Sequence, residues 1–172
     1  MHGYFKMDKI PEVEIRLSSY TDSAFIKDLS AKAFEPFGDY GDVVLNWYMS
    51  GQSITTVACH EEIPVGFSMV SRPFSRYDMI NSSELLAIGI EHEWQGKGIG
   101  KLLLKEIENA AKYAGIKTIF LHTAVENRNA RKLFSDSGYG IWQIKKNFYP
   151  KGQDACVMAK DIVTDQRALS GK

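Results

Sequence analysis

The stretch that decides the fold reads Gln95-Gly96-Lys97-Gly98-Ile99-Gly100. It follows the apolar run 85–90 and opens a segment, 99–114, whose Ile, Leu and Ala residues recur at helical spacing. Closely spaced glycines let backbone N–H groups converge on an anion, because no Cβ atoms stand in the way. A helix N-terminus adds unpaired N–H donors and about half a positive charge, and Lys97 and Lys101 add cationic charge nearby. The stretch therefore predicts a pyrophosphate-binding site.

Two other glycine motifs fit this stretch poorly. The dinucleotide-binding fingerprint needs its third glycine at the position that Lys101 occupies. A nucleoside-triphosphate loop needs Ser or Thr after Gly-Lys, but Leu102 follows Gly100-Lys101. A plain glycine-rich turn before a helix is the remaining alternative. The preceding strand, Gln95 and the order of the elements that follow favour phosphate binding.

The segments on either side of this stretch alternate between strand and helix patterns. Strand patterns cover residues 13–17, 54–60, 64–70, 84–90, 118–124, 139–144 and 155–160, with Glu61-Glu62-Ile63 as a hairpin connection. Helical patterns cover residues 24–34, 43–49, 99–114 and 127–138. This order predicts an α/β fold in which about four helices cover a mixed sheet of about seven strands. We expect a single domain over residues 1–172, with loose termini at 1–10 and 165–172.

Composition excludes several classes of function. The 172 residues include 21 Lys and Arg and 21 Asp and Glu, so the balance of charge does not favour nucleic acid or an anionic membrane as partner. Two cysteines and four histidines are scattered without metal-ligand spacing, so we expect no metal site. No apolar stretch approaches the roughly 18 residues of a membrane span, and the N-terminus has no signal-peptide core. We therefore expect a cytoplasmic protein, either a monomer or a homodimer.

The strand followed by Gln95-x-x-Gly98-x-Gly100 resembles the coenzyme-A-binding motif of the GCN5-related N-acetyltransferase (GNAT) superfamily. The resemblance covers about residues 12–162 and is strongest to the protein N-terminal acetyltransferases, including those that acetylate ribosomal-protein alanine. The residues that resemble this branch are Ile119-Phe120-Leu121-His122, Asn127, Ala130-Arg131-Lys132-Leu133-Phe134, Ser137-Gly138-Tyr139 and Lys145-Lys146-Asn147-Phe148-Tyr149. The resemblance implies transfer of an acetyl group from acetyl-CoA to a primary amine by direct attack in a ternary complex. The α-amine of a protein or peptide is the acceptor that it favours.

The resemblance also implies where acetyl-CoA binds. The sheet is expected to splay between strands 84–90 and 118–124, and the pantetheine arm to pair there with the backbone of Ile88, Gly89 and Ile90. The pyrophosphate is expected on the N–H groups of Gln95, Gly96, Lys97, Gly98, Ile99 and Gly100, with Lys101 beside it. Asn127 and Arg131 match positions that contact the coenzyme. Phe134 stands where many members carry the tyrosine that protonates the leaving thiolate; core packing explains Phe134 better, and the general acid stays unassigned.

Two residues are candidates for the general base. Glu84 opens the central strand at a position where related histone-type acetyltransferases carry a catalytic glutamate; the alternative is a solvated charge at a strand end. His122 lies in an apolar strand, and one branch of N-terminal acetyltransferases has a histidine there, paired through water with the neighbouring strand. Glu84 would be that neighbour. The alternative for His122 is a histidine whose hydrogen bonds are satisfied in the core.

Two aromatic loops are candidates for binding the acceptor. One contains Phe34, Glu35, Pro36 and Phe37, and the other contains Tyr149. A peptide acceptor predicts an open groove between these loops. A polyamine acceptor predicts a groove lined by the acidic residues Glu35, Asp39 and Asp42. Other small amines, and a non-catalytic module that only binds acetyl-CoA, remain as alternatives.

Overall fold

The computed structural model describes residues 12–73 and 81–163, so the expected loose termini at 1–10 and 165–172 lie outside the described residues. Its strands are β1 (Glu14–Leu17), β2 (Ser53–His60), β3 (Ile63–Ser71), β4 (Ser82–Ile90), β5 (Thr118–Ala124), β6 (Gly140–Lys145) and β7 (Ala155–Asp161). Its α-helices are α1 (Ser23–Phe34), α2 (Gly41–Met49), α3 (Ile99–Tyr113) and α4 (Arg128–Asp136), and short 3₁₀ turns precede α1 and α3. The described part of the chain thus contains the seven strands and four helices that the sequence predicts.

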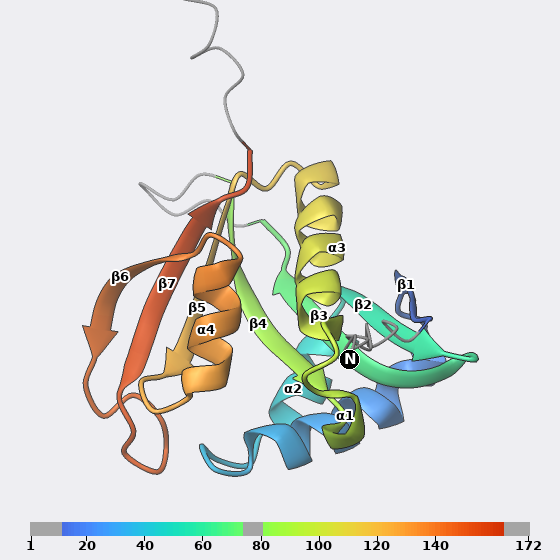
Figure 1. Cartoon of the computed structure of the whole chain (residues 1–172), viewed down its shortest axis with the longest axis horizontal. Coiled ribbons are helices and arrows are strands. Elements are labelled where there is room, and N and C mark those ends of the chain that lie inside the picture. The colour runs from blue at the N-terminus through green and yellow to red at the C-terminus, as the bar shows by residue number, and fades with distance from the viewer. Residues whose placement is uncertain (1–11, 74–80, 164–172) are drawn as a thin grey trace, which may run out of the picture.

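The seven strands form one sheet in the order β1-β2-β3-β4-β5-β7-β6, and β4–β5 is its one parallel pair among the described strands. That pair holds together only from Ser82 opposite Thr118 to Leu85 opposite Leu121. Beyond this point β4 continues to Ile90 and β5 to Ala124, but the two strands no longer pair with each other and diverge (Figure 1). The mixed, splayed sheet expected from the sequence is confirmed.

A β-bulge lies where β4 and β5 separate. The register with β3 runs from Val70 opposite Leu85 to Met69 opposite Ala87, so Leu86 is the extra residue. A bulge bends its strand and shifts the alternation of side chains by one residue. Leu85 accordingly packs in the cluster under α3 and α4, while Ala87 packs in the cluster under α1 and α2.

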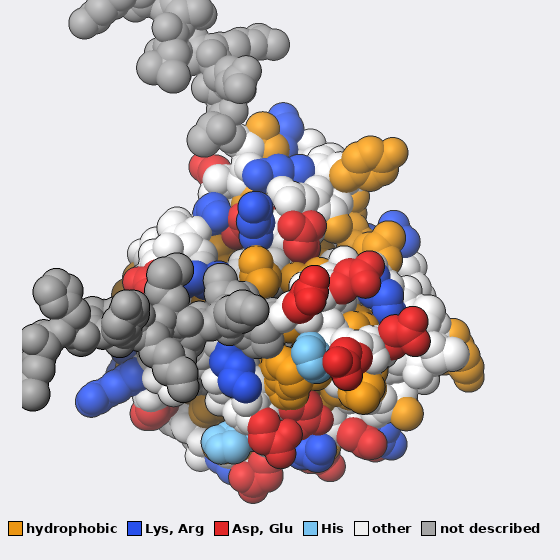
Figure 2. Space-filling model, turned by 45° about the vertical axis from the view of Figure 1, so that its right-hand side comes forward, with side chains coloured by type: hydrophobic (Ala, Val, Ile, Leu, Met, Phe, Trp, Pro, Cys, Tyr) orange, Lys and Arg blue, Asp and Glu red, His pale blue; other side chains and the backbone are white. Residues whose placement is uncertain are grey.

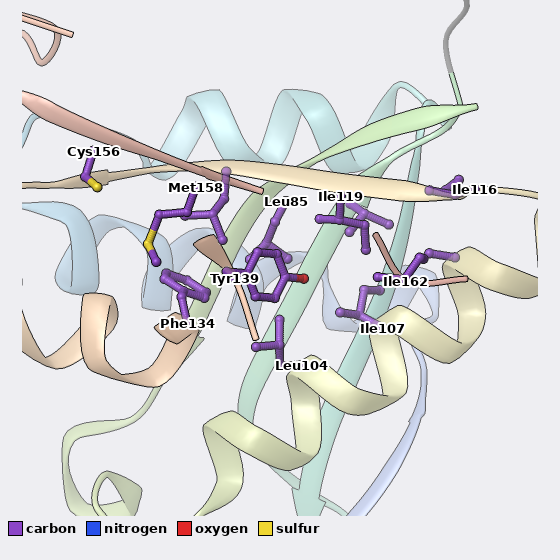
Figure 3. Close-up of a cluster of buried hydrophobic side chains, with 13 residues drawn as sticks. Leu85, Leu104, Ile107, Ile116, Ile119, Phe134, Tyr139, Cys156, Met158 and Ile162 are labelled. Atoms are coloured by element: carbon purple, nitrogen blue, oxygen red, sulfur yellow. The ribbon is translucent and has the colours of Figure 1, made fainter. Parts of the chain in front are cut away.

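Helices cover both faces of the sheet, with α3 and α4 on one face and α1 and α2 on the other (Figure 1). Figure 3 shows the larger core cluster, in which the ring of Tyr139 lies between Phe134 of α4 and the α3 side chains Leu104 and Ile107. The helical stripe of α3 is thereby buried against the sheet, as its spacing predicts. Both faces of the sheet are therefore covered, and β4 and β5 diverge between the two layers of helices.

The β2–β3 hairpin is one residue shorter than the sequence predicts. Ile63 pairs with His60 and belongs to β3, so the turn consists of Glu61 and Glu62 alone. Both residues have positive φ, 48° and 68°, the conformation that matches the twist of a two-residue hairpin. Glutamates carry little sequence signal for such a turn, since glycine and asparagine are the usual residues there.

None of the helices in the described ranges is long and apolar enough to cross a membrane. The face of the molecule in Figure 2 carries Lys and Arg side chains interspersed with Asp and Glu. This distribution agrees with the equal numbers of basic and acidic residues in the chain.

Candidate active site

A cavity of about 120 Å³ lies where β4 and β5 diverge. Its lining comes from both faces of the sheet and is mostly apolar: Phe34, Phe37, Tyr40, Val44, Leu85, Leu86, Ala87, Ile88, Leu121, His122, Thr123, Ala124, Asn127, Ala130, Phe134 and Tyr149. The cavity therefore reaches from α4, on the face of the sheet where the glycine stretch also lies, to the aromatic loops on the α1–α2 side, although no residue of the glycine stretch lines it. We use the terms coenzyme side and acceptor side for these two ends.

The glycine stretch leads from β4 into α3 in a conformation that only glycine adopts easily. Gly96 and Gly98 have φ of 73° and 83°, in the left-handed region. Within the described residues, the N–H groups of residues 96–100 donate no hydrogen bond. Five free donors beside a helix N-terminus form an anion-binding cradle.

Gly100 has a different role, because it lies where α3 crosses the sheet. A Cβ on Gly100 would come within 3.2 Å of Leu133 and 3.3 Å of Ile90. The glycine therefore allows α3, α4 and β4 to approach one another closely. Ile99 beside it is buried in the core.

The polar side chains of this stretch make contacts of their own. Gln95 Nε2 donates to the carbonyl oxygen of Ile90 at 3.0 Å, which fastens the loop to the end of β4. Lys97 Nζ lies 4.8 Å from the centre of the Trp94 ring. Lys101 Nζ lies 3.8 Å from an Asp136 carboxylate oxygen, and its side chain is 61% exposed. The cradle itself thus consists of backbone N–H groups, with the two lysines at its margin.

The residues predicted to bind the pantetheine arm lie on the part of β4 that no longer pairs with β5. Ile88 lines the cavity, and Gly89 is packed tightly, since a Cβ there would lie 3.2 Å from Phe67 and 3.4 Å from Leu29. The edge of β4 that faces β5 has no strand partner from residue 86 to residue 90. Unpaired backbone of this kind can pair with an extended, amide-containing ligand.

The residues at and in α4 that are predicted to contact the coenzyme also have structural roles. Asn127 caps the helix, its Oδ1 accepting from the N–H of Ala130 at 3.1 Å, and it also lines the cavity. Arg131 Nη1 donates to the carbonyl oxygen of Val125 at 2.9 Å, while its buried Nε has no partner within the described residues. Phe134 is buried in the core and also lines the cavity. Their contacts with a coenzyme stay predictions.

Glu84 and His122 face each other across the start of the divergence. His122 Nδ1 and Glu84 Oε1 are 2.8 Å apart. The contact is therefore direct, whereas the resemblance implied a pairing through a water molecule. The His122 side chain is 12% exposed and that of Glu84 is 33% exposed. The two candidate bases thus form one hydrogen-bonded unit at the edge of the cavity.

Lys145 of β6 extends this unit and was not identified from the sequence as a site residue. Its Nζ lies 3.0 Å from His122 Nε2, on the opposite side of the ring from Glu84. Phe148 stacks on the same imidazole, with ring centres 4.6 Å apart and planes within 3° of parallel. The sequence signal was indirect: both residues belong to the run 145–149 that carries the family resemblance.

The two aromatic loops contact each other over the acceptor side. Lys151 Nζ donates to the carbonyl oxygen of Glu35 at 2.6 Å and to its Oε1 at 3.1 Å. Gln153 Nε2 donates to the carbonyl oxygen of Pro36 at 2.7 Å, and the rings of Phe37 and Tyr149 are 5.3 Å apart. We call these contacts the clasp. It bridges the groove between the two loops, which a peptide acceptor was expected to leave open.

The predicted acceptor residues therefore divide into two groups. Phe34, Phe37 and Tyr149 line the cavity, whereas Glu35 and Pro36 hold the clasp. Burial and the nearby carboxylate of Glu84 raise the pKa of Tyr149, so its phenol keeps its proton.

Comparison with known proteins agrees with this geometry. The model of the acetyltransferase (GNAT) family matches residues 23–139. The chain belongs to this family. A ribosomal protein bS18-alanine N-acetyltransferase from Salmonella typhimurium is 28% identical over 87 residues, 49% of this chain and 59% of that protein. The enzyme of the same name from Haemophilus influenzae is 35% identical over 85 residues, 47% of this chain and 58% of that protein. The matches thus span less than two thirds of these relatives.

Solved GNAT structures share the fold over nearly the whole chain. An acetyltransferase from Salmonella typhimurium with its cofactor acetyl-CoA superposes with a TM-score of 0.77 at 18% identity, over 90% of this chain and 96% of that one. Arabidopsis thaliana NAA60 in complex with a bisubstrate analogue superposes with a TM-score of 0.74 at 17% identity, over 87% of this chain and 97% of that one. The GNAT assignment made from the sequence is confirmed for family and fold, and the expected donor agrees with the neighbour solved with acetyl-CoA.

Tyr139 is too deeply buried to take the place of the tyrosine that the resemblance leads us to expect at the position of Phe134. The Tyr139 hydroxyl donates to Glu108 Oε1 at 3.1 Å in the core under α3, and burial together with Glu108 raises its pKa. Lys160 Nζ also donates to Glu108, at 2.7 Å from Oε2. Tyr139 therefore belongs to a buried structural network of this GNAT fold, whereas Tyr40 and Tyr149 are the tyrosines that line the cavity.

No group of three or more His, Cys, Asp or Glu residues could hold a metal ion in the part of the chain that the structure describes.

Proposed function

We propose that this GNAT protein transfers the acetyl group of acetyl-CoA to the α-amino group of a protein or peptide. One arrangement carries the proposal: the free N–H cradle follows the end of β4, and the cavity where β4 and β5 diverge is lined by His122, which is hydrogen-bonded to Glu84. The family relation supports acetyl transfer. The names of the ribosomal-protein alanine N-acetyltransferases support an α-amine as acceptor.

The coenzyme would bind through the backbone. The five N–H groups of residues 96–100 suit the two phosphates of its pyrophosphate, and the unpaired edge of β4 suits the amides of its pantetheine arm. The thioester would then reach the bulge at Leu86, beside His122. This arrangement would place the reacting carbonyl at the cavity, next to His122.

The reaction needs a neutral amine, a base for its proton and a leaving thiolate. The nitrogen lone pair attacks the thioester carbonyl carbon, the C–S bond breaks, and the sulfur leaves as thiolate. The proton that the nitrogen gives up passes to the Glu84–His122 unit, directly or through one water. An α-amine, with a pKa of about 8, demands less of this base than a lysine side chain, with a pKa of about 10.4.

The cavity favours an uncharged first residue on the acceptor. No carboxylate lines it in the described ranges, and Phe34, Phe37, Tyr40 and Tyr149 supply aromatic walls. Two of the three acidic residues that would favour a polyamine acceptor are engaged elsewhere, since Glu35 pairs with Lys151 and Asp42 pairs with Lys27 at 2.7 Å. A peptide would enter end-on beneath the clasp, with its first side chain against the aromatic walls.

The test is thiol release from acetyl-CoA with a panel of acceptors. The panel contains peptides with free N-termini that begin with Ala, Ser, Met or Asp, the same peptides with a blocked N-terminus and one internal Lys, and spermidine. We expect release with the free peptides, greatest for apolar first residues. Release with spermidine or blocked peptides alone would refute the α-amine assignment. Acetyl-CoA binding without release from any acceptor would indicate a binding module.

A further inference from the structure

We propose that Lys145 is a positioning residue, which holds His122 as the neutral tautomer with its proton on Nδ1 and thereby leaves Glu84 as the base. The proposal rests on the proposed function, since it concerns the same proton transfer. It follows from the three-residue chain Glu84–His122–Lys145, whose two contacts measure 2.8 Å and 3.0 Å.

The direction of these hydrogen bonds follows from what each group can donate. An ammonium group has three N–H donors and no acceptor, so Lys145 Nζ must donate to His122 Nε2. Nε2 then carries a lone pair and no proton. The proton of the neutral imidazole is therefore on Nδ1, from which it is donated to the carboxylate of Glu84.

The surroundings fix the ring in this orientation. Phe148 lies parallel to the imidazole at 4.6 Å, and Lys145 Nζ lies 5.4 Å from the centre of the same Phe148 ring. A ring flip would turn carbon atoms toward both Glu84 and Lys145 and would break both hydrogen bonds. His122 lines the cavity but Lys145 does not, so the lysine supports the ring from behind.

This arrangement assigns different tasks to the two candidate bases. Both nitrogens of His122 are engaged, so neither is free to take a proton from the acceptor amine. Glu84 uses Oε1 for His122, and its Oε2 has no hydrogen bond to the described part of the chain. Oε2 is therefore the atom available to receive the proton, directly or through a water.

The neighbouring Lys146 shows that the contact of Lys145 is not a general property of this strand end. Lys146 points to solvent with a side chain 77% exposed and pairs with Asp154 at 2.7 Å. The two lysines are adjacent in sequence, but only Lys145 reaches the active site. Lys146 is therefore the matched control.

The first test reads the tautomer without any need for activity. Nitrogen-15 NMR of histidine-labelled protein distinguishes a protonated Nδ1 from a protonated Nε2. We expect His122 with the proton on Nδ1 in the wild type and in Lys146→Met, and loss of that single tautomer in Lys145→Met. A wild-type ring protonated on Nε2, or a Lys145→Met spectrum identical to that of the wild type, would overturn the proposal.

The second test uses thiol release with the best peptide of the panel. We expect Lys145→Met to lower kcat about tenfold with little change in KM, since general acid–base catalysis contributes roughly 10²–10⁴-fold and only its positioning is lost. Lys145→Arg, which restores a cationic donor, should recover most of kcat, and Lys146→Met should equal the wild type. A rise in KM alone, or failure of Arg to rescue, would mean that Lys145 only shapes the pocket.

The pH dependence of kcat/KM adds a third readout. The titratable groups that contact the His122 ring are Glu84 from β4 and Lys145 from β6, and the phenols of Tyr149 and Tyr40 line the same cavity as His122. A cation beside Nε2 opposes imidazolium formation, so Lys145→Met should move the acid limb to higher pH by about one unit, and Lys145→Arg should not. An unmoved acid limb in Lys145→Met would contradict the proposal. Wild-type inactivity toward every peptide would refute the proposed function instead, while the NMR result would still decide the tautomer.

Discussion

The coenzyme side and the acceptor side of the cavity are built in different ways. On the coenzyme side, the binding groups are backbone N–H groups of residues 96–100, and they lie together because two glycines have positive φ. On the acceptor side, the reactive groups are side chains from three strands. Glu84 and His122 are 38 residues apart in the chain, and His122 and Lys145 are 23 residues apart.

This difference explains how the two sides respond to mutation. A backbone site changes when its conformation changes, so a glycine within it matters more than the lysines beside it. A side-chain site depends on a hydrogen-bonded chain, so the loss of one member disturbs the others. Variants should therefore separate coenzyme binding from turnover cleanly.

The largest expected effect on turnover is that of Glu84→Gln. The amide cannot accept the amine's proton as a carboxylate does, so kcat should fall by roughly 10²–10⁴-fold. Acetyl-CoA affinity, measured by calorimetry, should be unchanged because the coenzyme side is untouched. Glu91→Gln is the matched control: Glu91 follows the other end of β4 and pairs with Lys32 at 3.5 Å. Full turnover in Glu84→Gln would show that the base lies elsewhere.

The next largest effect is expected for Gly98→Asp, which should weaken acetyl-CoA binding by about 10- to 100-fold, or roughly 1.4 to 2.8 kcal/mol. The new carboxylate would repel the pyrophosphate at the helix N-terminus. Gly115→Asp is the control at the opposite end of α3. Gly115 has the same φ of 83° as Gly98, and a Cβ at either position would meet nothing within 4 Å. Equal affinity in the two variants would refute the pyrophosphate assignment.

A smaller effect is expected from Lys151→Ala, which removes the ion pair of the clasp with Glu35. Exposed ion pairs contribute about 0–1 kcal/mol, so KM for a peptide should rise about two- to threefold while kcat and acetyl-CoA affinity stay constant. Lys27→Ala removes a comparable exposed pair, with Asp42, away from the clasp and serves as control. A changed kcat would mean that the clasp also orders the reacting groups.

The same contrast determines what could be predicted from the sequence. Element order, the glycine stretch and the helix stop at Gly115 were predictable, because each depends on residues within one or two turns of the chain. The splay between β4 and β5 followed only from the family resemblance. The bulge at Leu86, which sends Leu85 and Ala87 to opposite faces, has no glycine or proline to mark it.

The acceptor side was predictable only in part. His122 stood out because a histidine is unusual in an apolar strand, and Glu84 was paired with it by resemblance. Lys145 did not stand out, because lysine is ordinary at the end of an edge strand and its contact crosses the intervening strand β7. The clasp was missed because Lys151 and Gln153 lie in a loop whose conformation depends on tertiary contacts with Glu35 and Pro36.

The smallest effect on turnover is expected from Tyr139→Phe, a change in the core behind the coenzyme side. The variant loses the hydrogen bond to Glu108, but Glu108 keeps its two contacts with Lys160. The free energy of unfolding should therefore fall by about 1 kcal/mol, measured by urea denaturation, with turnover unchanged.

The pH dependence of that difference tests the origin of the stabilisation. Burial and Glu108 raise the pKa of Tyr139 in the folded protein above the value of about 10 of an exposed phenol. The unfolded chain thus releases this proton first, so the advantage of the wild type over Tyr139→Phe is fully present below pH of about 10 and is lost as the pH rises toward the folded-state pKa. Other tyrosines ionise equally in both proteins and cancel in the difference. An advantage that stays constant across this range would mean that the hydroxyl contributes only packing, and that the network under α3 is not held by the charge of Glu108.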